Sequence, residues 1–145
     1  MYKHILIATD GSELAEKAVK AGLGLAKALG ARATAVTVTE PWTAFVTGEA
    51  IIAFPFGEYE KSAADMAAKI LASVSSDAKQ LDTACATVHI KEQNPAEGIL
   101  QTAKDSDCDL IVMASHGRRG LARLLLGSQA LRVLTYSAVP VLICR

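Results

Sequence analysis

The segment HILIATDGS, His4 to Ser12, joins a strand-like run to the start of a helix and sets the pattern for the whole chain. His4 to Ala8 is apolar on both faces, which is typical of a central strand in a parallel sheet. Glu13 to Leu29 follows with apolar residues at helical spacing, and Gly30 is suited to end that helix. The segment therefore predicts a strand, a tight turn and a helix.

The same alternation continues to the end of the chain. β-Branched or apolar runs predict further strands at Arg32–Thr39, Cys85–Ile90, Cys108–Met113 and Val139–Cys144. Helical patterns occupy Tyr59–Leu81, the stretch from the N-cap Asn94 to Lys104, and Ser128–Ser137. This order predicts one α/β domain over residues 1–145, with an open, mostly parallel five-stranded sheet covered by helices on both faces.

The composition narrows the function classes. Fifteen basic and fifteen acidic residues give a net charge of zero, which disfavours nucleic acid and anionic membranes as partners. No apolar run is long enough to cross a membrane, and the amino terminus lacks the pattern of a signal peptide. Cys85, Cys108 and Cys144 lie far apart in apolar runs, as expected of reduced core thiols in a cytoplasmic protein.

The segments that follow strands are the expected binding site, because open α/β sheets bind ligands beyond the carboxyl ends of their strands. They are Thr9–Ser12, Val38–Glu40 and the loop ASHGRRGLARLLLGS, Ala114 to Ser128. In that loop, glycines and the first turn of the next helix favour an anion site. Ser128 would add a hydroxyl, and Arg118, Arg119 and Arg123 could add positive charge. The chain has neither a P-loop nor a dinucleotide-binding glycine motif.

The loop resembles the nucleotide motif of the universal stress protein family, Gly-x2-Gly-x9-Gly-Ser/Thr. Gly117, nine residues, and Gly127-Ser128 match its second half, while HILIATDGSELAEKAV and SAVPVLICR are similar to the two ends of the family's sequence. The resemblance implies a Rossmann-like sheet of order 3-2-1-4-5 and binding of ATP, with AMP or ADP as alternatives and Mg²⁺ accompanying the nucleotide.

Position by position, the resemblance implies that Asp10 lies beside the ribose and metal, that Val38 meets adenine through its backbone, and that Gly117, Gly127 and Ser128 hold the phosphates. The full set of expected binding residues is Ala8, Thr9, Asp10, Val38, Ala114, Ser115, His116, Gly117, Arg118, Gly127 and Ser128.

Ala114 departs from the motif, whose first position is glycine. Its methyl group costs little if φ is negative and Cβ points away from the ligand, and it weakens binding otherwise. Two functions stay open: an ATP-binding regulatory module, and a nucleotide-independent interaction protein whose site is lost at Ala114. At most slow ATP hydrolysis is expected, because His116 has no evident catalytic partner in the sequence. A hydrolase or nucleotidyl transferase that uses His116 or Asp10 is a weaker third alternative.

Three further interpretations concern single features. Asp10 and Glu13 also fit a capping box at the start of the first helix. Trp42 to Phe56 is apolar and irregular, so it is expected to form a lid or an interface. Val139–Cys144 would be an apolar edge strand, and the family resemblance agrees that it joins two copies in a homodimer.

Overall fold

A computed structural model describes residues 1–44, 55–118 and 125–145 of the chain. The sheet contains β1 (His4–Ala8), β2 (Arg32–Val38), β3 (Cys85–Ile90), β4 (Leu110–Ala114) and β5 (Val141–Cys144). Its strands are all parallel and follow the order β3-β2-β1-β4-β5, which confirms the predicted topology. The order reverses between β1 and β4, so a crevice opens beyond their carboxyl ends.

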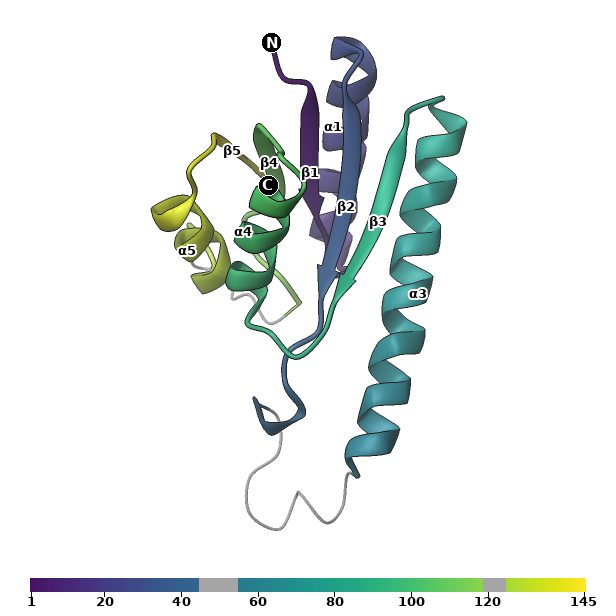
Figure 1. Ribbon diagram of the computed structural model, residues 1–145, viewed down its shortest axis with the longest axis vertical. Helices are drawn as coiled ribbons and strands as arrows, with labels where there is room; N and C mark the ends of the chain where they lie inside the picture. Colours follow the sequence, from purple (N-terminus) through teal and green to yellow (C-terminus); the bar gives the residue numbers. More distant parts are fainter. Residues whose placement is uncertain (45–54, 119–124) are drawn as a thin grey trace.

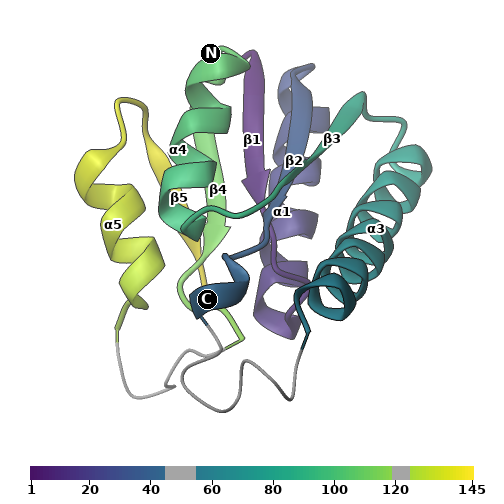
Figure 2. The ribbon, with the colours of Figure 1, turned by 60° about the horizontal axis from the view of Figure 1, so that its bottom comes forward.

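In the described part of the chain, four α-helices cover the two faces of the sheet (Figure 1, Figure 2). α1 (Glu13–Leu29) and α3 (Phe56–Gln80) pack on one face, where Ile5, Ile7 and Val112 are buried. α4 (Pro95–Asp105) and α5 (Ser128–Tyr136) pack on the other face, over Leu6 and Ile111. The central strands β1 and β4 are buried on both faces, as the continuous apolar run at His4–Ala8 predicted.

The ends of several elements differ from the prediction. β4 begins at Leu110 because Cys108 still closes α4, its N–H donating to Ala103 O at 2.9 Å. α3 begins at Phe56, three residues before the predicted start, and a short 3-10 turn covers Trp42–Ala44. The rest of the expected lid or interface segment, residues 45–54, lies outside the described residues.

No helix in the described part of the chain is long and apolar enough to cross a membrane. The three cysteines are free thiols, with Cys108 buried and the other two half-buried. Burial, with a smaller contribution from Asp109, raises the pKa of Cys108 to about 11. These environments agree with the interpretation of the cysteines as core thiols.

Gly22 in α1 tests how closely this helix must approach the sheet. A Cβ at Gly22 would lie 2.7 Å from Ile7 Cγ1, whereas a Cβ at Gly24 in the same helix would meet nothing within 4 Å. We expect Gly22→Ala to be less stable than Gly24→Ala by about 1–3 kcal/mol, because the added methyl group overpacks the core. Both variants gain the same helix propensity, so their difference in urea unfolding isolates the packing; equal free energies of unfolding would contradict the close approach.

Candidate functional site

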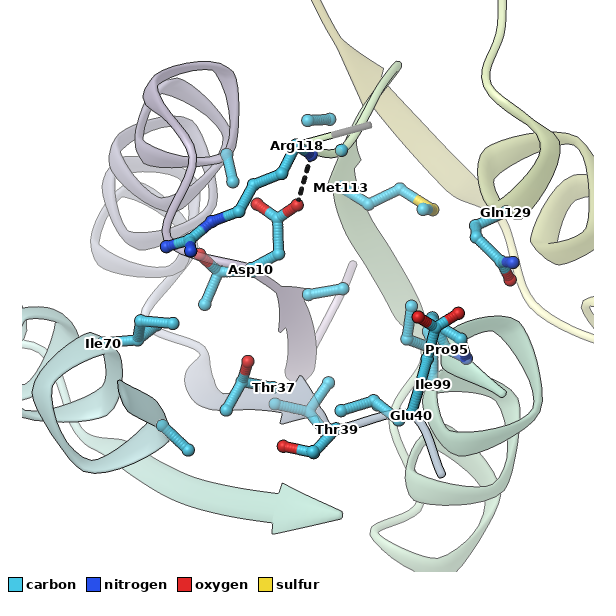
Figure 3. Close-up of a pocket in the computed structure, with 18 of the residues that line it drawn as sticks. Asp10, Thr37, Thr39, Glu40, Ile70, Pro95, Ile99, Met113, Arg118 and Gln129 are labelled. Atoms are coloured by element: carbon cyan, nitrogen blue, oxygen red, sulfur yellow. Dashed lines mark hydrogen bonds between the residues drawn. The ribbon is translucent and has the colours of Figure 1, made fainter. Parts of the chain in front are cut away.

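A cavity of about 540 Å³ opens at the carboxyl ends of β1, β2 and β4, between α3 on one side and the first turns of α4 and α5 on the other (Figure 3). Its volume lies within the range of pockets that hold small molecules and cofactors. Ten of the eleven residues expected to bind ligand line it; Ser115 is not among the lining residues. The three loops singled out from the sequence therefore meet at one cavity.

The carboxylate of Asp10 connects two of these loops. Its Oδ1 accepts a hydrogen bond from Ser12 N at 2.9 Å, and its Oδ2 accepts one from Arg118 N at 2.8 Å. The second bond spans the reversal in strand order, from the end of β1 to the loop after β4. Asp10 thus holds the β4 loop against the start of α1.

The capping-box interpretation of Asp10 is wrong. Ser12 is the N-cap of α1, and its Oγ accepts a hydrogen bond from Ala15 N at 3.2 Å. Gly11 has φ +76°, and this left-handed conformation places Ser12 at the N-cap position. Asp10 therefore lies two residues before the N-cap.

The two glycines of the motif are required by protein contacts. A Cβ at Gly117 would lie 2.8 Å from Asp10 Oδ2, and a Cβ at Gly127 would lie 3.2 Å from the carbonyl oxygen of Ser115. Each glycine thus has a structural reason of its own, beside the phosphate contact that the family resemblance implies. A side chain at position 117 would displace the Asp10 carboxylate, and one at position 127 would lie too close to the Ser115 carbonyl oxygen.

Ser115 fixes both ends of the loop without facing the cavity. Its N–H donates to Cys144 O at 2.8 Å, and its carbonyl accepts from Gly127 N at 2.7 Å. The Gly127 N–H is therefore occupied, and the helix bond from Leu131 N to Gly127 O follows it. The amides at the first turn of α5 that remain for an anion are those of Ser128, Gln129 and Ala130.

His116 is held by its neighbour. Its Nδ1 lies 3.0 Å from Ser115 Oγ, and its Nε2 is buried with no hydrogen-bond partner among the described residues. A general base needs a nitrogen that reaches the substrate, and the enclosed Nε2 of His116 is not placed for this.

Arg118 turns its guanidinium toward α3. Its Nη2 lies 3.8 Å from Met66 Sδ, and the side chain extends away from Gln129, which follows the start of α5 (Figure 3). The sequence analysis expected the positive charge of Arg118 near the phosphates; in this structure its guanidinium lies on the α3 side of Asp10. Arg119 and Arg123 fall outside the described residues.

Ala114 ends β4 in an extended conformation and is 8% exposed. The non-glycine residues with positive φ in the described chain are Asp82, Glu92 and Asp107, so Ala114 has the negative φ that alanine tolerates. Its side chain packs in the core cluster on the α1 face, although the residue also borders the cavity. The first of the two conditions set for a harmless alanine is met.

The backbone of Val38 has a free edge toward the cavity. Thr9 N donates to Val36 O at 3.0 Å, and Thr39 N donates to Ile90 O at 2.8 Å, so odd residues of β2 face β3 and even residues face β1. Because β1 ends at Ala8, no β1 residue lies opposite Val38, and the Val38 N–H and C=O face the cavity. A backbone donor and acceptor are thus presented side by side.

Several lining residues were not identified from the sequence. They come from the cavity face of α3, from β2 and from the starts of α4 and α5: Thr37, Tyr59, Ala63, Met66, Ala67, Ile70, Pro95, Ile99 and Gln129. Gln129 ties two helices together, since its Oε1 accepts from Ala96 N at 3.0 Å. The helical spacing of Ala63, Met66, Ala67 and Ile70 was a usable signal, but it does not distinguish a cavity wall from core.

Within the described residues, no group of three or more His, Cys, Asp or Glu side chains is arranged to hold a metal ion. A metal at this cavity would thus take most of its ligands from a bound molecule or water.

Comparison with known proteins agrees with the sequence resemblance. The model of the Universal stress protein family matches residues 1–145. A Thermus aquaticus protein, the universal stress protein in QAH/OAS sulfhydrylase 3′region, is 34% identical over 145 residues, covering 100% of both chains.

Solved structures share the fold. The hypothetical protein MJ0577 of Methanocaldococcus jannaschii superposes with a TM-score of 0.81 at 27% identity, covering 99% of this chain and 96% of that one. A universal stress protein in complex with cAMP gives 0.70 at 22% identity, covering 99% and 97%. An Archaeoglobus fulgidus universal stress protein in complex with dAMP gives 0.62 at 18% identity, covering 99% and 98%.

Replacing Asp10 by asparagine tests the connection between the loops. Asn offers one acceptor oxygen in place of two, so one of the amides of Ser12 and Arg118 loses its partner. We expect hydrogen exchange of at least one of these two amides to quicken by about tenfold, which corresponds to the loss of one charge-assisted hydrogen bond.

Asp109→Asn is the matched control, because Asp109 also accepts two backbone N–H groups, those of Lys3 and His4, at the opposite end of the sheet. Unchanged exchange at Ser12 and Arg118 in Asp10→Asn, or equal acceleration there in both variants, would contradict the role of Asp10.

Proposed function

Because the chain belongs to the universal stress protein family, we propose that it is an ATP-binding regulatory module that holds the nucleotide in the cavity between β1, β2 and β4. The observation that carries the proposal is the pairing of two features across one cavity: the free backbone edge of Val38 and the open first turn of α5. Relatives in complex with cAMP and dAMP support an adenine nucleotide as the ligand class.

The phosphates would lie at the start of α5. The amides of Ser128, Gln129 and Ala130 open this helix, and its dipole favours negative charge at that end. The exposed Ser128 would add its hydroxyl as a further donor. Gln129 fixes the direction of this turn through its bond to Ala96 N, so the donors are oriented before a ligand arrives.

The adenine would pair with Val38. Adenine presents an acceptor, N1, beside a donor, the 6-amino group, and this pattern complements an adjacent N–H and C=O. Pro95, Ile99 and Met113 give the cavity apolar walls on this side, suited to the faces of a purine ring. A Cβ at Gly98 would lie 2.7 Å from Val38 Cγ2, so close packing of α4 fixes the position of Val38.

Asp10 would lie between these two ends, beside the sugar. Each of its carboxylate oxygens accepts one backbone N–H and keeps lone pairs for a ligand or for Mg²⁺. In the proposal, Mg²⁺ enters with the triphosphate and is held mainly by phosphate oxygens and water.

Ala114 is compatible with this proposal on the first condition, because its φ is negative; the second condition, a Cβ directed away from the nucleotide, is part of the proposal and is supported by the packing of Ala114 in the core cluster on the α1 face. We infer binding without turnover, since the Nε2 of His116 is enclosed. The proposed output is a change in contacts with a protein partner, through residues bordering the cavity.

A homodimer through Val139–Cys144 remains part of the proposal. β5 is an edge strand, and Leu142 on it is 41% exposed. Leu131, Leu134 and Tyr136 on the neighbouring α5 are also exposed, so a second copy would cover an apolar edge and an apolar helix face together.

Ser128→Glu tests the placement of the phosphates. Glutamate in the first turn suits the helix dipole, so α5 should remain folded. The new carboxylate would repel a triphosphate by about 1–4 kcal/mol at 4 Å. We therefore expect calorimetry to show ATP binding at least about tenfold weaker, with adenosine binding unchanged.

Ser76→Glu is the control, since Ser76 is exposed on α3 away from the cavity and the change in net charge is the same. The phosphate placement fails if Ser128→Glu binds ATP as tightly as Ser76→Glu does. The whole proposal fails if the unmodified protein binds no adenine nucleotide at millimolar concentration.

A further inference from the structure

Thr37 is a buried residue whose hydroxyl has no hydrogen-bond partner among the described residues. The residue is 4% exposed and lines the cavity, and its hydroxyl points into it (Figure 3). No hydrogen bond of this hydroxyl is formed with any described residue.

The other buried hydroxyls of the described chain all have partners. Thr34 Oγ1 lies 2.8 Å from His4 Nε2, and Thr102 Oγ1 donates to Gly98 O at 2.7 Å. Thr9 Oγ1 accepts from Gly11 N, and Ser115 Oγ lies 3.0 Å from His116 Nδ1. Among the buried residues that carry a hydroxyl in residues 1–44, 55–118 and 125–145, Thr37 is thus the exception. Its Oγ1 is not one of the fully enclosed polar atoms that lack a partner, so the hydroxyl is accessible from the cavity.

The cavity explains why this hydroxyl has no protein partner. The side chain lies on the α3 face of β2, where Ala67 and Ile70 of α3 form an apolar wall of the cavity. Water can satisfy the hydroxyl while the cavity is open to solvent. A molecule that fills the cavity displaces this water, and it loses affinity unless it offers Thr37 a polar group of its own.

Thr37 points toward Asp10, on the opposite side of the cavity (Figure 3). Asp10, when ionised, only accepts hydrogen bonds, whereas a threonine hydroxyl both donates and accepts. A group that fits between them must donate to Asp10 and pair in either direction with Thr37. The two neighbouring hydroxyls of a ribose do both.

We propose that Thr37 is a specificity-determining residue that binds a ribose hydroxyl opposite Asp10, so that the cavity selects ribonucleotides over deoxyribonucleotides. This inference rests on the proposed nucleotide site. With the base at Val38, the next residue of β2, and the phosphates at the start of α5, the sugar occupies the middle of the cavity. The selectivity arises because a deoxy sugar leaves the Thr37 hydroxyl dry and unpaired.

Calorimetry with ATP, 2′-deoxy-ATP and 3′-deoxy-ATP tests the inference. The unmodified protein should bind at least one deoxy analogue about tenfold more weakly than ATP, the size of one buried hydrogen bond. Thr37→Val keeps the shape of the side chain and removes the hydroxyl. It should weaken ATP binding by about the same factor and abolish the preference over the analogue that lacks the hydroxyl facing Thr37, because that analogue has no bond to Thr37 to lose. A preference that arises from the hydroxyl at Asp10 should persist.

Two variants bracket this result. Thr37→Ser retains the hydroxyl and should retain the preference. Thr87→Val makes the same change on the neighbouring strand β3, outside the cavity, and should bind all three nucleotides like the unmodified protein. Thr37→Val should unfold no earlier than the unmodified protein, since it removes no hydrogen bond to the described residues.

The outcomes separate the two proposals. If the unmodified protein binds ATP and both deoxy analogues equally, or if Thr37→Val weakens all three by the same factor, the role of Thr37 is wrong and the nucleotide site stands. If no adenine nucleotide binds, both proposals fall. The comparison of nucleotides on the unmodified protein decides the question even if Thr37→Val does not fold.

Discussion

The site depends on the two hydrogen bonds that the Asp10 carboxylate accepts. One comes from Ser12 and fixes the turn into α1; the other comes from Arg118 and holds the loop after β4. Parallel strands place their carboxyl ends at one edge of a sheet, but only a contact of this kind determines how the loops beyond them sit. Gly117 follows from the same constraint, because a Cβ there would occupy the position of Asp10 Oδ2.

The cavity combines fixed donors with an adaptable wall. The backbone of Val38 and the first turn of α5 are set by secondary structure, and Gln129 and Ser115 connect that turn to α4 and to the β4 loop. The wall from α3 is apolar and carries Met66, a flexible side chain, against the Arg118 guanidinium. The polar groups of the cavity thus have positions determined by secondary structure, whereas the α3 side contributes an apolar surface that can adapt to the ligand.

The sequence predicts the fold further than it predicts the site. Apolar runs locate all five strands to within a few residues, and the family resemblance supplies their order. The role of Asp10 as a cap was wrong because the same letters, Asp-Gly-Ser, allow either Asp10 or Ser12 to start the helix, and the left-handed Gly11 decides it. Thr37 and the α3 wall were missed because a strand threonine and an alanine-rich helix look alike in core and cavity. Which of them faces a void depends on tertiary packing that periodicity does not encode.

The most direct test of the account is a crystal structure of the protein grown with ATP and Mg²⁺. The account predicts adenine against the backbone of Val38, ribose between Asp10 and Thr37, and phosphates at the amides of Ser128 to Ala130. A nucleotide bound elsewhere on the molecule, or one with its phosphates toward α3 and its base at α5, would contradict it.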